Sequence, residues 1–112
     1  MAGTAENRLL KLKRLGQSPW LDQISRDLVR SGRLQRMVDQ DGIGGVTSNP
    51  AIFERAIGQG REYDEEILAL ARQGLSAAEI YDRLAIDDVR AACDVLAPVY
   101  LGSGGEDGFV SI

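Results

Sequence analysis

One carboxylate, Asp22, stands directly after the apolar pair Trp20 and Leu21. A carboxylate in the partly desolvated place where a strand ends can act as a general acid or base. The alternative is structural, because aspartate is also favoured at the start of a helix, and a helix is predicted from about Gln23. Position alone leaves both interpretations of Asp22 open.

A second polar group, Thr47, Ser48 and Asn49, follows a glycine-rich run and precedes Pro50. Two hydroxyls and an amide are suited to orienting a polyol, because an asparagine side chain both donates and accepts hydrogen bonds. In the structural alternative, Asn49 caps the next helix and Pro50 occupies its first turn, where no N–H is needed. The residues alone give these two interpretations equal weight.

Both groups need strands to position them. Short strands are predicted at residues 19–22, 45–48 and 109–112, with long helical stretches between them. This alternation favours parallel strands joined by helical crossovers, hence an α/β fold. The carboxyl ends of such strands are where α/β proteins carry their sites, and both polar groups stand at these ends.

Apolar residues at helical spacing predict the connecting helices. These helices cover residues 5–16, a stretch from about 23, 34 to about 41, 51–57, 62–73, and two separate stretches after residue 76. Ser76 and Glu79 have the spacing of a capping box. Cys93 lies on an apolar stripe, so we expect a small core residue there. The acidic runs 64–66 and 87–88 are expected to be solvated helix starts, which suit the helix dipole.

The glycines at 42, 44 and 45 do not form a phosphate-binding loop. Their spacing fits neither the dinucleotide fingerprint nor the P-loop, and no Lys-Ser or Lys-Thr pair follows them. Tight turns and close packing are therefore the expected reason for these glycines.

Composition excludes several classes of protein. The chain has 112 residues, which predicts one domain, and its net charge of −4 argues against a nucleic-acid interface. A single cysteine cannot form an internal disulfide, and the absence of histidine removes most hydrolase triads and zinc sites. No apolar run is long enough for a membrane span or a secretory signal, so we expect a cytoplasmic protein that binds neither membranes nor nucleic acid.

Several segments, taken in order, resemble transaldolases, in particular the bacterial branch with a long N-terminal segment. They are residues 17–22, 25–28, 45–53, 86–94 and 107–112. The combination of Trp-Leu-Asp with Thr-Ser-Asn-Pro at this distance is specific. The resemblance implies that residues 1–112 form a single incomplete domain. That domain would be the N-terminal portion of a (β/α)8 TIM barrel, with about three strands and their crossover helices.

The resemblance also implies an activity in the pentose phosphate pathway. Transaldolases move a dihydroxyacetone unit between sugar phosphates through a lysine Schiff base, without a cofactor or a metal. Residue by residue, Asp22 matches the strand-one aspartate that transfers a proton of the sugar hydroxyl. Thr47 and Asn49 match the strand-two residues that hold the dihydroxyacetone moiety, and no role transfers to Ser48.

Three elements of the family have no counterpart in this sequence. The strand-three glutamate would fall just past Ile112, the Schiff-base lysine belongs to strand four, and the phosphate-binding arginine and serine come later. The only lysines here are Lys11 and Lys13, both in the first predicted helix. The resemblance therefore implies that these residues alone are inactive as a transaldolase.

Three other interpretations remain open at this point. Residues 74–96 could form a helix-turn-helix binding module, although the second helix offers only Arg90 as a basic residue. The chain could be a non-catalytic relic that pairs with another chain through an exposed sheet edge. A glucose-6-phosphate isomerase domain could also be fused downstream, as in some transaldolases.

Overall fold

Three short parallel strands organise the computed structural model, which describes residues 8–22 and 24–111. The strands are β1 (Trp20–Leu21), β2 (Gly45–Thr47) and β3 (Phe109–Ser111), and their order in the sheet is β1-β2-β3. Both pairings are parallel, so the predicted α/β arrangement is confirmed. The predicted helix start at residue 5, and residues 23 and 112, lie outside the described part.

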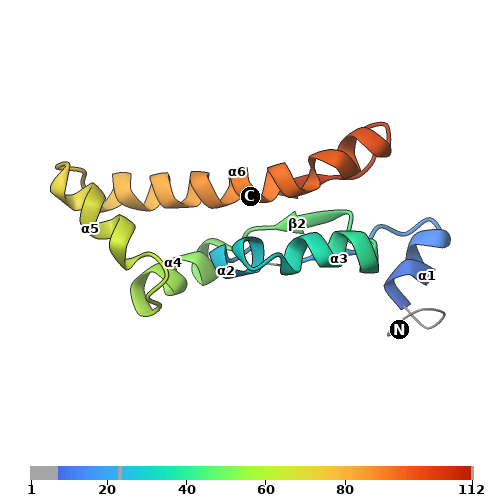
Figure 1. The fold of residues 1–112 in the computed structure, drawn as a ribbon, viewed down its shortest axis with the longest axis horizontal. Helices are drawn as coiled ribbons and strands as arrows, with labels where there is room; N and C mark the ends of the chain where they lie inside the picture. Colours follow the sequence, from blue (N-terminus) through green and yellow to red (C-terminus); the bar gives the residue numbers. More distant parts are fainter. Residues whose placement is uncertain (1–7, 23, 112) are drawn as a thin grey trace.

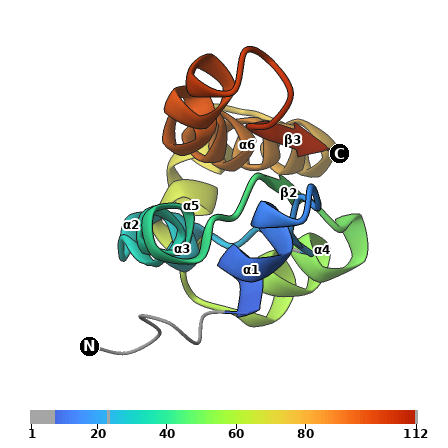
Figure 2. The same cartoon turned by 90° about the vertical axis from the view of Figure 1, so that its right-hand side faces the viewer.

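Helices precede and connect the strands, and some of them cover one face of the sheet. They are α1 (Arg8–Arg14), α2 (Arg26–Arg30), α3 (Arg33–Asp41), α4 (Pro50–Gln59), α5 (Asp64–Arg72) and α6 (Ala77–Gly102). α6 runs along one long side of the molecule, while α4 and α5 lie toward one end and α1 toward the other (Figure 1). The end-on view shows α6 beside β3, with α2 and α3 packed beneath α6 (Figure 2).

The main core lies between the sheet and helices α2, α3 and α6. Side chains alternate across a strand, so every second strand residue faces the helices. Leu21, Val46 and Val110 are these residues, and they pack against Leu34 of α3 and Leu96 of α6, both fully buried. This packing fixes which strand residues remain for the opposite face.

The opposite face, which we call the open face, carries Trp20, Gly45 and Phe109 in one row. The rings of Trp20 and Phe109 stack with their centroids 6.5 Å apart. Gly45 lies between them in register, and a Cβ atom there would overlap the indole ring of Trp20. Close packing therefore explains this glycine, as predicted from the sequence.

The predicted capping box opens α6. The Glu79 N–H donates to Ser76 Oγ at 3.2 Å, and the Ser76 N–H donates to Glu79 Oε1 at 3.0 Å. The hydrogen bond from the Ser76 backbone, followed by its side-chain hydrogen bond, lowers the pKa of Glu79 below its ordinary value. A lowered pKa means that the helix start is more stable when Glu79 is ionised.

A synthetic peptide of residues 74–92 should therefore lose helicity on the Ser76→Ala change, since an N-cap of this kind contributes about 0.5–2 kcal/mol. The parent peptide should also lose helicity as the pH falls below about 4.3 and through the lowered pKa of Glu79. Circular dichroism measures both effects. Glu79→Gln keeps a capping partner but cannot titrate, so the helicity of this peptide should depend less on pH than that of the parent peptide. An equal loss of helicity in acid for the parent and Glu79→Gln peptides would contradict the role of ionised Glu79 in capping α6.

α6 is one continuous helix, so the predicted break into two helices is wrong. Leu84, Asp88, Ala92 and Leu96 are all buried, because their four-residue spacing places them on one stripe of a single helix. The continuous helix removes the turn that a helix-turn-helix module in this region needs. Within the described residues, no helix is both long and apolar enough to cross a membrane.

Two expectations about residues of α6 are also wrong. Asp88 is only 4% exposed, so the pair at residues 87–88 is not a solvated helix start. Cys93 is exposed, not a core residue, because α6 turns its stripe of Asp88 and Ala92 toward the other helices. The acidic run at residues 64–66, by contrast, does occupy the first turn of α5.

Candidate functional site

Asp22 and Thr47 lie side by side at the carboxyl ends of β1 and β2. The Thr47 hydroxyl donates a hydrogen bond of 2.6 Å to the main-chain oxygen of Asp22. Leu21 of β1 pairs with Val46 of β2, so the next residues along the chain, Asp22 and Thr47, lie beside each other. Thr47 in turn pairs with Ser111 of β3. The alternation along the strands puts these polar residues on the open face, beyond the aromatic row.

Asp22 does not cap α2. The N-cap is Ser25, whose Oγ accepts the N–H of Leu28 at 3.0 Å, and α2 begins at Arg26. Asp22 is exposed at the end of β1, three residues before that cap. The structural alternative considered for Asp22 is thus wrong, because a serine closer to the helix takes the capping role.

Asn49 does cap α4. Its Oδ1 accepts the N–H of Ala51 at 3.0 Å, and its main-chain oxygen accepts the N–H of Phe53 at 2.9 Å. Pro50 is the first residue of α4, as predicted. The capping interpretation is therefore confirmed, and the capping bond holds the amide of Asn49 in a defined orientation. A role in binding a polyol is compatible with this orientation and remains a prediction.

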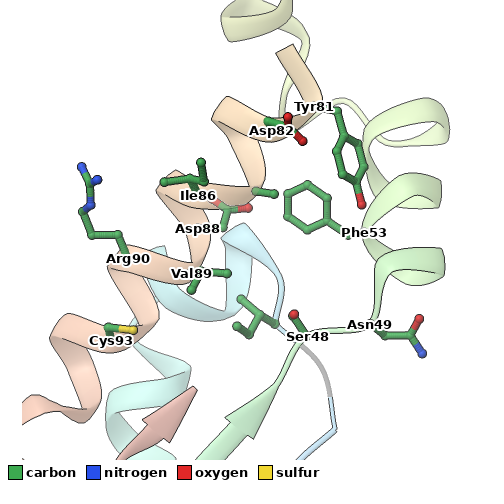
Figure 3. A pocket seen from close by; sticks show the side chains of 12 residues that line it. Ser48, Asn49, Phe53, Tyr81, Asp82, Ile86, Asp88, Val89, Arg90 and Cys93 are labelled. Atoms are coloured by element: carbon green, nitrogen blue, oxygen red, sulfur yellow. The ribbon is translucent and has the colours of Figure 1, made fainter. Parts of the chain in front are cut away.

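Ser48 points to the other side of the chain from Asn49 (Figure 3). Its side chain faces a hollow of about 660 Å³ between α4 and α6, whereas the Asn49 side chain at the rim points away (Figure 3). Mostly apolar side chains line the hollow, among them Phe53, Val89 and the exposed Cys93. This hollow is not the place where Asp22 and Thr47 meet, because the alternation of the chain puts Ser48 and Thr47 on opposite sides.

A charged network behind the site was missed from the sequence. Arg26, only 3% exposed, donates from Nε to Asp88 Oδ1 at 2.9 Å and from a terminal nitrogen to Glu66. Its guanidinium also lies over the Tyr63 ring, 4.2 Å from the centroid, and the Tyr63 hydroxyl donates to Asp88. Three side chains, from α5, α6 and the turn before α5, thus surround one buried cation of α2.

The environment of this network alters two pKa values. Burial alone would lower the pKa of Arg26, but its hydrogen bond to Asp88 and the charges of Asp88 and Glu66 raise it. Burial, and then the hydrogen bond to Asp88, raise the pKa of Tyr63 well above its ordinary value. One signal in the sequence could have revealed the network, because Asp88 interrupts the apolar stripe of Leu84 and Ala92.

Among residues 8–22 and 24–111, no three acidic or cysteine side chains are arranged to hold a metal ion. The side chains available on the open face at the carboxyl edge include the Asp22 carboxylate, the hydroxyls of Thr47 and its register partner Ser111, and the Asn49 amide, which suit proton transfer and the binding of hydroxyl groups.

Fold and site together define a class: an α/β protein with parallel strands, helical crossovers and polar residues gathered at the carboxyl ends of the strands. Residues 19–112 match the Transaldolase/Fructose-6-phosphate aldolase family, and the chain belongs to this family. The resemblance noted from the sequence is thereby confirmed.

Curated relatives show the same relationship. The chain is 51% identical over 106 residues to Transaldolase 2 of Nostoc punctiforme. This match covers 95% of the chain and 28% of the relative. It is 50% identical to a transaldolase of Neisseria gonorrhoeae, with 93% of this chain and 29% of the relative covered. A transaldolase of Thiobacillus denitrificans is 46% identical over 90% of this chain and 28% of its own length. The chain thus spans little more than a quarter of these relatives.

Proposed function

We propose that these residues form the first three strands, with their crossover helices, of a transaldolase barrel. The complete enzyme transfers a dihydroxyacetone unit from sedoheptulose 7-phosphate to glyceraldehyde 3-phosphate, giving erythrose 4-phosphate and fructose 6-phosphate. The observation that carries this proposal is the contact of Thr47 with Asp22 at the carboxyl edge of a parallel sheet, in a chain of this family. A barrel enzyme binds its substrate at that edge.

The proposed reaction uses Asp22 for proton transfer. The family's lysine, which lies outside these residues, adds to the ketose carbonyl and loses water to give an iminium ion. Asp22 accepts the proton of the C4 hydroxyl while the C3–C4 bond breaks, and the bonding electrons move to the iminium, giving an enamine. The enamine then attacks the aldehyde of the acceptor sugar, Asp22 returns the proton to the new alkoxide, and hydrolysis releases the product.

Thr47 and Asn49 are proposed to hold the dihydroxyacetone unit. The Thr47 hydroxyl donates to the main chain at Asp22, so its oxygen can still accept a hydrogen bond from a substrate hydroxyl. The capping bond at Oδ1 orients the amide of Asn49 at the start of α4. Both contacts pre-organise the two side chains before a substrate arrives, which is the condition for efficient positioning.

A chimaera tests this proposal in a complete barrel. All 112 residues replace the matching N-terminal part of the Nostoc punctiforme relative, and the unaltered relative serves as the control. Formation of fructose 6-phosphate from sedoheptulose 7-phosphate and glyceraldehyde 3-phosphate is measured. We expect the chimaera to retain kcat within about tenfold of the control. A folded chimaera without activity, beside an active control, would overturn the proposal.

The chain by itself is expected to form no covalent adduct when borohydride is added with fructose 6-phosphate. Its lysines, Lys11 and Lys13, both lie on α1, and Lys13 Nζ is 3.5 Å from the main-chain oxygen of Gly42. Gly42 precedes β2, so this lysine lies at the amino end of the sheet, opposite to Asp22. Mass spectrometry reads the result, and an adduct on either lysine would show this expectation to be wrong.

A further inference from the structure

We infer that Arg26 and Asp88 are positioning residues for Asp22, and this inference rests on the proposed function. The ion pair holds the first turn of α2 against α6. Asp22 lies four residues before Arg26, on the short connection that leads from β1 into α2. Neither member of the pair touches the open face, so both act on the site only through the backbone.

Arg26 is held from three directions. Asp88 of α6 binds its Nε, Glu66 of α5 binds a terminal nitrogen, and the Tyr63 ring lies against its flat face. A guanidinium is planar and presents its donors in a rigid fork, so this set of partners fixes both the position and the rotation of the side chain. The Tyr63 hydroxyl in turn donates to Asp88, which orients that carboxylate.

The connection between Asp22 and Arg26 is fixed at both ends. Thr47 holds the main-chain oxygen of Asp22 at 2.6 Å, and the charged network holds Arg26. Between them, Ile24 is 5% exposed within the main core and Ser25 caps α2. Without the network, only strand pairing, apolar packing and the single Thr47 bond among these described contacts would oppose a movement of α2 that displaces Asp22.

Stability alone is a weak explanation for this network. An apolar pair of similar volume often replaces a buried ion pair without loss of stability, because the charges lose their hydration on burial. An apolar pair, however, lacks the directional bonds that resist sliding or rotation of α2. Small misplacements of a catalytic group have large kinetic effects, up to about 10²-fold for a shift of about 1 Å.

The test uses the chimaera with Arg26→Met and Asp88→Leu combined, so that no unpaired charge stays buried. We expect kcat to fall about 10²-fold, while KM for sedoheptulose 7-phosphate stays within about twofold. Borohydride trapping of the ketose should proceed at the parent rate, because formation of the Schiff base does not require Asp22. Arg33→Met is the matched control, since Arg33 makes an exposed ion pair with Asp27, which lies on the same helix as Arg26.

A purely structural role predicts a different pattern. It would change Tm, and kcat would then follow the folded fraction, with trapping reduced in parallel. Tyr63→Phe supplies a milder variant, because it removes one donor to Asp88 and keeps the ion pair. An unchanged kcat in a folded double variant, or equal loss of kcat and trapping, would overturn the inference.

Crystal structures of the same proteins give a readout that needs no activity. In the double variant, the Thr47 Oγ1 to Asp22 oxygen distance should exceed the 2.6 Å of the parent by enough to break the hydrogen bond. An intact bond at the parent distance would contradict the positioning role. An inactive parent chimaera, by contrast, would contradict the proposed function. The Thr47–Asp22 distance in the parent and the double variant would then still decide whether Arg26 and Asp88 position Asp22.

Discussion

Replacing Asp22 by asparagine in the chimaera should lower kcat about 10²- to 10⁴-fold, the range typical for loss of a general acid or base. Asparagine has nearly the same shape but cannot take up and return the proton. The hydrogen bond from Thr47 goes to the main-chain oxygen of Asp22, so the change leaves it in place. Steady-state kinetics with sedoheptulose 7-phosphate and glyceraldehyde 3-phosphate measure the effect.

Asp27→Asn is the control for this change. Asp27 is an exposed carboxylate on α2 that forms an ion pair with the exposed Arg33, and such surface pairs contribute little to stability. The control should therefore keep the parent kcat. If Asp22→Asn also keeps it, Asp22 transfers no proton in the reaction and its assignment as the catalytic residue is wrong.

Gly108→Ala should destabilise the chimaera by about 2–4 kcal/mol, from backbone strain and overpacking together. Gly108 has a φ of +92°, a conformation that residues with a side chain rarely adopt. A Cβ atom there would lie 2.7 Å from Cα of Tyr100, and a backbone atom in α6 cannot move aside cheaply. The Gly108 N–H also donates to the Gly44 oxygen at 2.6 Å, which ties this position to the start of β2.

Alanine variants at two other glycines separate the cost of backbone strain from the cost of steric overlap. Gly104 also has a positive φ, +67°, but has open space where a Cβ would lie, so Gly104→Ala should cost only about 1–2 kcal/mol. Gly102 has open space and lies in α6, so its change to alanine should be neutral or slightly stabilising. Urea unfolding measures all three. Equal effects at Gly108 and Gly104 would show that the overlap with Tyr100 is relieved by movement.

Local signals in the sequence located the strands and most helix ends correctly. Gly42 ends α3 with a φ of +71°, and Pro50 begins α4, so glycine and proline mark both sides of β2. Ser76 and Glu79 form the predicted capping box. In each case the residue acts on its own backbone within a few positions, which is why the sequence alone was sufficient.

Features that depend on distant partners were not predictable in this way. Asp88 was interpreted as a solvated helix start because acidic residues favour that place, yet its partner Arg26 lies 62 positions away. The exposure of Cys93 likewise depends on which stripe of α6 the other helices cover. Asp22 and Thr47 were predicted singly from strand ends, whereas the hydrogen bond between them, across 25 positions, follows only from the sheet register.

The most direct test of the whole account is a crystal structure of the chimaera after reduction with borohydride in the presence of fructose 6-phosphate. We expect the trapped dihydroxyacetone unit to lie over the open face of the sheet. Its hydroxyl groups should be within hydrogen-bond distance, about 2.5–3.2 Å, of the side chains of Asp22, Thr47 and Asn49. An adduct bound elsewhere, with these three side chains in contact only with solvent, would contradict the assignment of this edge as the active site.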